Sequence, residues 1–233
     1  KDEKIYGRGA TDDKGNMLAP ILAVGALLKS GAKLPVNIKF FFEGQEEIGS
    51  PTLAPFVKAN AELLRADMIV SADGSQYGED QPSLIRGLKG LMGCEICVTG
   101  AKGDQHSGMH GGGIANPVHA LSHLIASMRD LEGKINIEGF YDDVEELKVA
   151  DRKAIAEIPF DDGEYAKGLG VPETFGEVGY TTAERLAARP TLELNGMWGG
   201  YQGKGIKTVL PSKAYAKITC RLVANQKPDK IYE

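Results

Sequence analysis

The chain has 233 residues, 42% of them hydrophobic, which is enough for one large or two ordinary domains. Its 32 acidic and 27 basic residues give a net charge of -5, so we expect no nucleic-acid partner. The sequence has no run of about 18 apolar residues, so we expect no membrane span. With three cysteines and no apolar signal core in its first residues, we expect a cytoplasmic compartment.

The first 85 residues alternate helical and strand patterns, which is typical of a parallel sheet with crossover helices. Apolar residues at helical spacing predict helices over residues 16–30 and 51–64. Short apolar runs predict strands over residues 36–42 and 67–72, after an opening strand. We therefore expect a β-α-β-α-β order in this part of the chain.

From about Gly87 the pattern changes to that of an α+β domain with an antiparallel sheet. Strands are predicted over residues 88–101, 134–139, 191–202 and 212–223, and the last two are expected to pair. Helical segments are predicted over residues 116–132, within 142–189 and from 227 onward. The sequence TTAE at residues 181–184 predicts a capping box for the last helix of the long polar stretch.

Cys94 and Cys97 form a CxxC pair inside one of these strand patterns. Residues three apart on a strand point to opposite faces of the sheet, which favours buried thiols over the alternative of a shared metal or redox site. We therefore interpret them as buried thiols.

Three acidic clusters, GRGATDDKGN, EGQEEIGS and SADG, each come after a predicted strand of the first domain. The carboxyl ends of parallel strands share one rim, so we expect Asp12, Glu46, Glu47 and Asp73 to converge. Crowded carboxylates must hold protons or surround cations, and two metal ions with a free carboxylate as base would account for all four. Taken singly, each cluster is an ordinary turn or a partner of a helix dipole. Their shared position favours a metal site.

The motifs YGRGATDDKG, EGQEEIGS, SADG and GDQHSGMHGG, in this order, resemble those of the co-catalytic di-zinc metallopeptidases of clan MH. This family includes carnosine dipeptidases, glutamate carboxypeptidases, acetylornithine deacetylase and succinyl-diaminopimelate desuccinylase. EEIGS and RGLKG are closer to the dipeptidase branch. The resemblance implies an α/β fold in which residues 1–86 are part of a parallel or mixed-sheet catalytic domain. Residues 87–233 would be an inserted α+β, ferredoxin-like lid and dimerisation domain, incomplete at its C-terminal end.

The resemblance also implies roles for the acidic residues. Asp12 would bridge two zinc ions and would precede a cis peptide bond, while Glu47 and Asp73 would each bind one ion. Glu46 would be the general base. Manganese or cobalt would suit the same ligands.

In the lid, the resemblance implies that His106 stabilises the oxyanion in the partner subunit's active site. Asn195, Thr208 and Arg221 match positions near the substrate, and Arg221 would bind the free carboxylate of a dipeptide. A homodimer is therefore part of the expected mechanism.

Two metal-binding histidines of the family pattern, one ahead of the bridging Asp and one near the far end, are absent from this sequence. We therefore expect a central fragment of a longer enzyme, inactive alone, whose parent hydrolyses dipeptides. One alternative is an N-acyl amino acid deacylase or desuccinylase of the same family. Another is a non-catalytic dimerisation or binding module.

Overall fold

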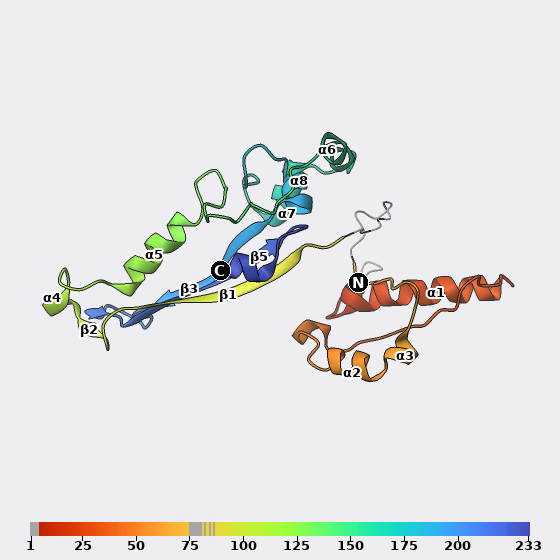
Figure 1. Cartoon of the computed structure of the whole chain (residues 1–233), viewed down its shortest axis with the longest axis horizontal. Helices are drawn as coiled ribbons and strands as arrows, with labels where there is room; N and C mark the ends of the chain where they lie inside the picture. Colours follow the sequence, from red (N-terminus) through yellow and green to blue (C-terminus); the bar gives the residue numbers. More distant parts are fainter. Residues whose placement is uncertain (1–4, 75–80, 82, 84, 86) are drawn as a thin grey trace. The chain divides into compact units, whose positions relative to one another are not determined.

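The structure, a computed structural model, describes residues 5–74, 81, 83, 85 and 87–233. The chain divides into two compact units, Lys1–Arg86 and Gly87–Glu233, which we call unit 1 and unit 2 (Figure 1). The catalytic and lid roles expected for these two units stay predictions.

Unit 1 contains η1 (Ala10–Gly15), α1 (Asn16–Lys29), η2 (Glu46–Ile48), α2 (Leu53–Ala59) and α3 (Ala61–Leu64). The helix predicted over residues 16–30 is confirmed by α1, and the one predicted over residues 51–64 forms as α2 and α3. None of the described residues 5–74 is buried. The opening strand that we predicted falls mainly on residues 1–4, which lie outside the described residues.

The strands predicted over residues 36–42 and 67–72 are wrong for the described part of unit 1, where neither segment belongs to a sheet. The first segment packs on helices instead: Phe41 stacks on Phe56 with ring centroids 5.8 Å apart. The Lys39 Nζ atom also donates to two carbonyl groups at the end of α3, both at 2.7 Å. A β-strand requires backbone hydrogen bonds to a neighbouring strand, which apolar composition alone cannot supply.

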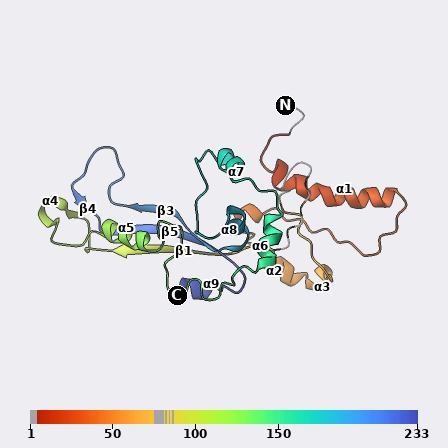
Figure 2. The ribbon, with the colours of Figure 1, turned by 90° about the horizontal axis from the view of Figure 1, so that it is seen from above.

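Unit 2 is an α+β fold built on a three-stranded antiparallel sheet with the order β1-β5-β3 (Figures 1 and 2). These strands are β1 (Gly90–Thr99), β3 (Thr191–Gly199) and β5 (Lys213–Leu222), and they confirm three of the four predicted strands and the pairing of the last two. A second, two-stranded sheet joins β2 (Gln105–His106) to β4 (Val209–Leu210).

The helices of unit 2 are α4 (Ser107–His110), α5 (Pro117–Ser127), α6 (Val149–Ala156), α7 (Asp162–Leu169), α8 (Thr182–Ala188) and α9 (Pro228–Tyr232). They confirm the predicted helical segments, with three separate helices in the long polar stretch. The predicted capping box is present, because Thr181 accepts from the Glu184 N–H and the Glu184 carboxylate accepts from the Thr181 N–H. None of the described helices has the length and apolar character needed to cross a bilayer.

The core of unit 2 lies on one face of the three-stranded sheet, which α5 covers (Figure 1). Along β5 every second residue is buried, as expected for a strand with one solvated face. Fully buried Leu121 of α5 packs on Ala214 and Ala216, whose small side chains let the helix approach closely. Gly199 serves the same purpose, since a Cβ atom there would lie 3.1 Å from Val118 of α5.

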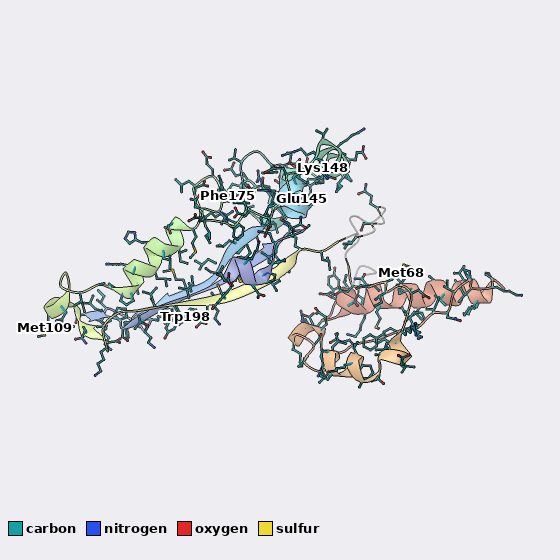
Figure 3. All side chains as sticks on the ribbon, viewed as in Figure 1. Met68, Met109, Glu145, Lys148, Phe175 and Trp198 are labelled. Carbon is teal, nitrogen blue, oxygen red and sulfur yellow. The ribbon has the colours of Figure 1, made fainter. Side chains whose placement is uncertain are left out.

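The opposite face of this sheet carries polar and aromatic side chains. Trp198 of β3 stacks on Tyr215 of β5 with ring centroids 5.1 Å apart, and Lys217 Nζ lies 5.6 Å from the centre of the Trp198 ring. In Figure 3, Trp198 is on the side of the sheet away from α5.

The helices and sheets together confirm the α/β fold class expected from the sequence, with small antiparallel sheets in the described residues.

Two smaller predictions are wrong. The strand predicted over residues 134–139 is reduced to a single bridge between Arg129 and Ile135, because the residues that would pair with it beyond this bridge belong to the helix α5, which ends at Ser127. The two CxxC thiols do point to opposite faces of β1, but only Cys94 faces the core, so Cys97 is exposed rather than buried.

Candidate functional site

The predicted acidic residues of unit 1 lie in three loops. Asp12 interrupts η1 with non-helical φ and ψ of -101° and 98°, and the peptide bond to Asp13 is cis, as the resemblance implied. Glu46 and Glu47 begin the short η2, which ends at Gly49 with a φ of 81°. Asp73 follows the segment 67–72, and its backbone N–H donates to the hydroxyl group of Ser71 at 3.3 Å.

Two contacts join these loops to one another. Four residues before Asp12, the Arg8 guanidinium lies 3.7 Å from the Glu47 carboxylate. Four residues after Asp12, the Asn16 side-chain amide donates to the carbonyl group of Gly74 at 2.6 Å. The loop of Asp12 is therefore linked on one side to the loop of Glu47 and on the other side to the loop of Asp73.

These contacts do not gather the acidic side chains into one cage: the described residues contain no group of three Asp, Glu, His or Cys side chains close enough to share a metal ion. Like charges that can reach solvent avoid one another, and Asp12, Glu47 and Asp73 are all exposed. The chemistry of the donors nevertheless suits divalent cations, which carboxylate oxygens bind. Asp13 Oδ1, next to Asp12, is buried without a hydrogen-bond partner and is a further oxygen available near this loop.

Two predicted site residues of unit 2 are in direct contact. The His106 Nε2 atom lies 3.2 Å from the Thr208 hydroxyl oxygen, although the two residues are 102 positions apart. The pairing of β2 with β4 and the bond from the Ser107 N–H to the Thr208 carbonyl group at 3.1 Å hold their backbones together. Figures 1 and 2 both place β2 and α4 at one end of unit 2. Both side chains are therefore presented together from that end.

Arg221 lies on the open face of the sheet, paired with Thr191 of β3 and Leu91 of β1. Lys89 is close to it: burial, and then the positive charge of Arg221, lower the pKa of Lys89 from its usual 10.5 to about 8. The Lys89 Nζ atom donates to the carbonyl groups of Arg185 and Arg189 at 2.8 and 2.6 Å. Two basic groups therefore lie near each other at this point, which favours an anionic ligand.

Asn195 lies on β3 at an irregularity where the pairing with β5 shifts register between Leu194 and Gly196. Such a bulge leaves one residue unpaired and redirects its side chain. The structure does not bring Asn195 into contact with Arg221, since these residues lie at different positions along the sheet.

A cavity of about 380 Å³ in unit 2 is lined by Arg189, Tyr141, Tyr180 and other residues, none of them a predicted site residue.

Sequence reasoning missed Lys89, Arg8 and Asn16. Lys89 is part of the RGLKG motif, and Arg8 and Asn16 flank Asp12 at equal distances in the sequence. Their places beside Asp12 and within RGLKG could have drawn attention to these three residues. Their contacts with Glu47, Gly74 and the end of α8 are visible only in the folded structure.

Comparison with known proteins supports the resemblance. The family profile described as "Peptidase dimerisation domain" matches residues 86–233. The Cys-Gly metallodipeptidase dug1 of Schizosaccharomyces pombe is 33% identical over 230 residues, covering 98% of this chain and 48% of the relative. The Beta-Ala-His dipeptidase of Rattus norvegicus is 33% identical over 232 residues, covering 99% of this chain and 47% of the relative.

Among solved structures, the M20 family metallo-carboxypeptidase Sso-CP2 from Sulfolobus solfataricus matches with a TM-score of 0.81 and 37% identity, over 96% of this chain and 51% of that one. The chain thus spans about half the length of the relatives it matches.

Proposed function

The chain belongs to the M20 peptidase family, and from this premise we propose that the protein is a metal-dependent exopeptidase that hydrolyses the amide bond of dipeptides. The observation that carries the proposal is the linkage of three acidic loops through the contacts on either side of Asp12. The similarity to relatives named as dipeptidases supports the choice of dipeptides over N-acyl amino acids. A cytoplasmic location stays a prediction.

We assign Asp12, Glu47 and Asp73 as ligands of two divalent metal ions, for which zinc is the first choice and manganese or cobalt would suit the same oxygens. When bound, these ions would supply Lewis-acid activation of the scissile carbonyl group and of the attacking water. Residues 1–86 contain no histidine, so any imidazole ligand would come from elsewhere in the protein.

Glu46 is the general base of the proposal. It is adjacent to a ligand carboxylate but is itself exposed at the start of η2, so its carboxylate is free to take a proton from the attacking water. The same group then passes the proton to the leaving amine.

Unit 2 supplies the groups that bind the substrate. Arg221, with Lys89 beside it, binds the free carboxylate of the dipeptide, and Asn195 and Thr208 contact the rest of the substrate. His106 donates a hydrogen bond to the oxygen of the scissile carbonyl group as negative charge develops on it. We propose that unit 2 is the dimerisation domain of a homodimer and that His106 acts in the partner subunit's active site.

The experiment uses the whole protein that contains this chain. Metal content and hydrolysis of a dipeptide panel are measured for the unchanged protein, for Glu46→Gln and for Glu43→Gln, an exposed glutamate of the same loop, as the control. We expect Glu46→Gln to retain metal and lose activity, and Glu43→Gln to retain both. Activity on N-acyl amino acids alone would favour a deacylase, and an unchanged protein without any hydrolytic activity would refute the proposal.

A further inference from the structure

The hydrogen bonds around the His106 ring determine which nitrogen carries its proton. The backbone N–H of Gly108 points to Nδ1 at 3.1 Å, and a backbone N–H can only donate. Nδ1 is therefore an acceptor without a proton, and the ring is neutral with its proton on Nε2. The Nε2–H group then donates to the Thr208 hydroxyl oxygen at 3.2 Å.

We propose that Gly108 and Thr208 are positioning residues that hold His106 as a neutral Nε2–H hydrogen-bond donor. Gly108 fixes the tautomer from one side of the ring, and Thr208 fixes the direction of the Nε2–H group from the other. The β2-β4 pairing and the Ser107–Thr208 backbone bond keep the two supports at a constant separation. The ring is thus oriented before any substrate is present.

This arrangement suits a group that donates to an oxyanion and not one that removes a proton. A neutral imidazole whose Nδ1 is occupied offers one free function, its Nε2–H, and a fixed donor aimed at developing charge costs no reorganisation during the reaction. In the substrate complex the Nε2–H would be shared between the Thr208 oxygen and the carbonyl oxygen of the substrate, so Thr208 would continue to direct it during the reaction. This last step rests on the proposed function, whereas the tautomer does not.

Gly108 offers a specific test because a side chain there would disturb the ring directly. A Cβ atom on Gly108 would lie 2.9 Å from His106 Cε1 and 3.2 Å from Nδ1, so the ring must move in Gly108→Ala. Gly103 is the control, since it lies just before β2 and a Cβ atom there meets nothing within 4 Å. For Thr208, valine removes the hydroxyl group at nearly constant shape, and serine restores it.

The first measurement is a long-range ¹H–¹⁵N correlation of the histidine rings in the 233-residue chain, with His106→Gln to assign the His106 signals. We expect a pyridine-like Nδ1 and a protonated Nε2 in the unchanged chain, in Gly103→Ala and in Thr208→Ser. Gly108→Ala and Thr208→Val should shift these signals toward those of an unrestrained ring. A protonated Nδ1 in the unchanged chain, or signals that neither variant alters, would overturn the proposal.

The second measurement is steady-state kinetics of the whole enzyme. Thr208→Val should lower kcat by about threefold to tenfold, the usual effect of one neutral hydrogen bond, with a smaller change in KM, and Thr208→Ser should restore kcat. If the ring signals shift but kcat does not, the positioning role is refuted. If the unchanged enzyme is inactive, the proposed function fails, while the ring signals still decide the tautomer.

Discussion

The ion pair between Arg189 and Glu177 provides the most direct test of the energetics of unit 2. The Arg189 side chain is only 5% exposed, and its Nε and Nη2 atoms donate to the two Glu177 oxygens at 2.8 and 2.7 Å. The guanidinium carbon also lies 4.3 Å from the centre of the Tyr180 ring and 5.2 Å from that of Tyr141. Replacing Glu177 by glutamine therefore leaves a buried positive charge without its counter-charge but between two aromatic rings.

Removing one partner of a buried pair costs about 3 to 5 kcal/mol. Each ring attracts the cation with about 0.5 to 2 kcal/mol and remains in place in the variant, so we expect the lower end, about 3 kcal/mol. In a unit of this size each kcal/mol lowers the melting temperature by about 2 to 4 °C. Glu177→Gln should therefore lower the melting temperature of unit 2 by roughly 6 to 12 °C.

The assays are thermal denaturation for the melting temperature and urea denaturation for the free energy of unfolding, both followed by tryptophan fluorescence. Trp198 is the single tryptophan of the chain, and its stacking on Tyr215 makes it a reporter of the three-stranded sheet. Glu95→Gln is the control, because Glu95 forms a surface ion pair with Lys217, whose Nζ atom lies 4.0 Å from the carboxylate. Both side chains are largely exposed, and such pairs contribute about 0 to 1 kcal/mol to the free energy of unfolding. Equal losses in the two variants would refute the reasoning.

The double variant Glu177→Leu/Arg189→Met separates charge from packing. Replacing both members of a buried pair with apolar residues is often neutral, so this variant should recover most of the stability lost in Glu177→Gln. A further loss in the double variant would mean that the pair stabilises unit 2 through its hydrogen-bond geometry rather than by neutralising a buried charge.

Two further outcomes follow from unit 2. Leu121→Ala, at a fully buried position on the sheet-facing side of α5, should cost about 2 to 5 kcal/mol in urea denaturation. Leu131→Ala, at a position 96% exposed, should cost less than about 0.5 kcal/mol. Because the folded chain releases the Lys89 proton near pH 8 and the unfolded chain only near 10.5, the free energy of unfolding should rise with pH between these values. Lys89→Met should flatten this rise when denaturation is repeated across that range, and an equal slope in both proteins would contradict it.

The sequence was most informative where local pattern and burial agree. The alternation of KAYAKITCRL predicts one buried and one open face, and the strand β5 has that alternation at every position. The α5 helix was equally predictable, since Asn116 caps its first turn and Pro117 occupies its first position. Both elements are specified by short-range patterns that the tertiary structure reinforces.

The errors occur where a strand depends on a distant partner. Residues 36–42 and 67–72 have strand composition, but composition does not supply the neighbouring backbone that a sheet requires. Residues 134–139 alternate as a strand does, but the chain that would pair with them beyond Ile135 is the helix α5, so no ladder can extend. In each case a non-local interaction overrides a correct local preference.

The site was predictable as a set of residues and not as a geometry. The resemblance pointed to His106 and Thr208 separately, but their contact arises from pairing between β2 and β4 across about a hundred residues. The contact of Gly108 with the His106 ring is local, between residues two apart. The lowered pKa of Lys89 depends likewise on burial and on Arg221, which belongs to a strand far along the chain. Such electrostatic effects need coordinates.

The division of the chain separates the buried core from the predicted metal ligands, which strengthens the tests of those ligands. The buried residues of the described chain all belong to unit 2, whereas the described residues 5–74, which carry the predicted metal ligands, are at least partly exposed throughout. Exposed side chains away from packed contacts rarely change stability by more than about 0.5 kcal/mol. A change at Asp12 or Glu46 is therefore expected to leave the urea denaturation curve of unit 2, followed by Trp198 fluorescence, unaltered. Loss of metal or activity in such a variant can then be assigned to the site itself and not to unfolding.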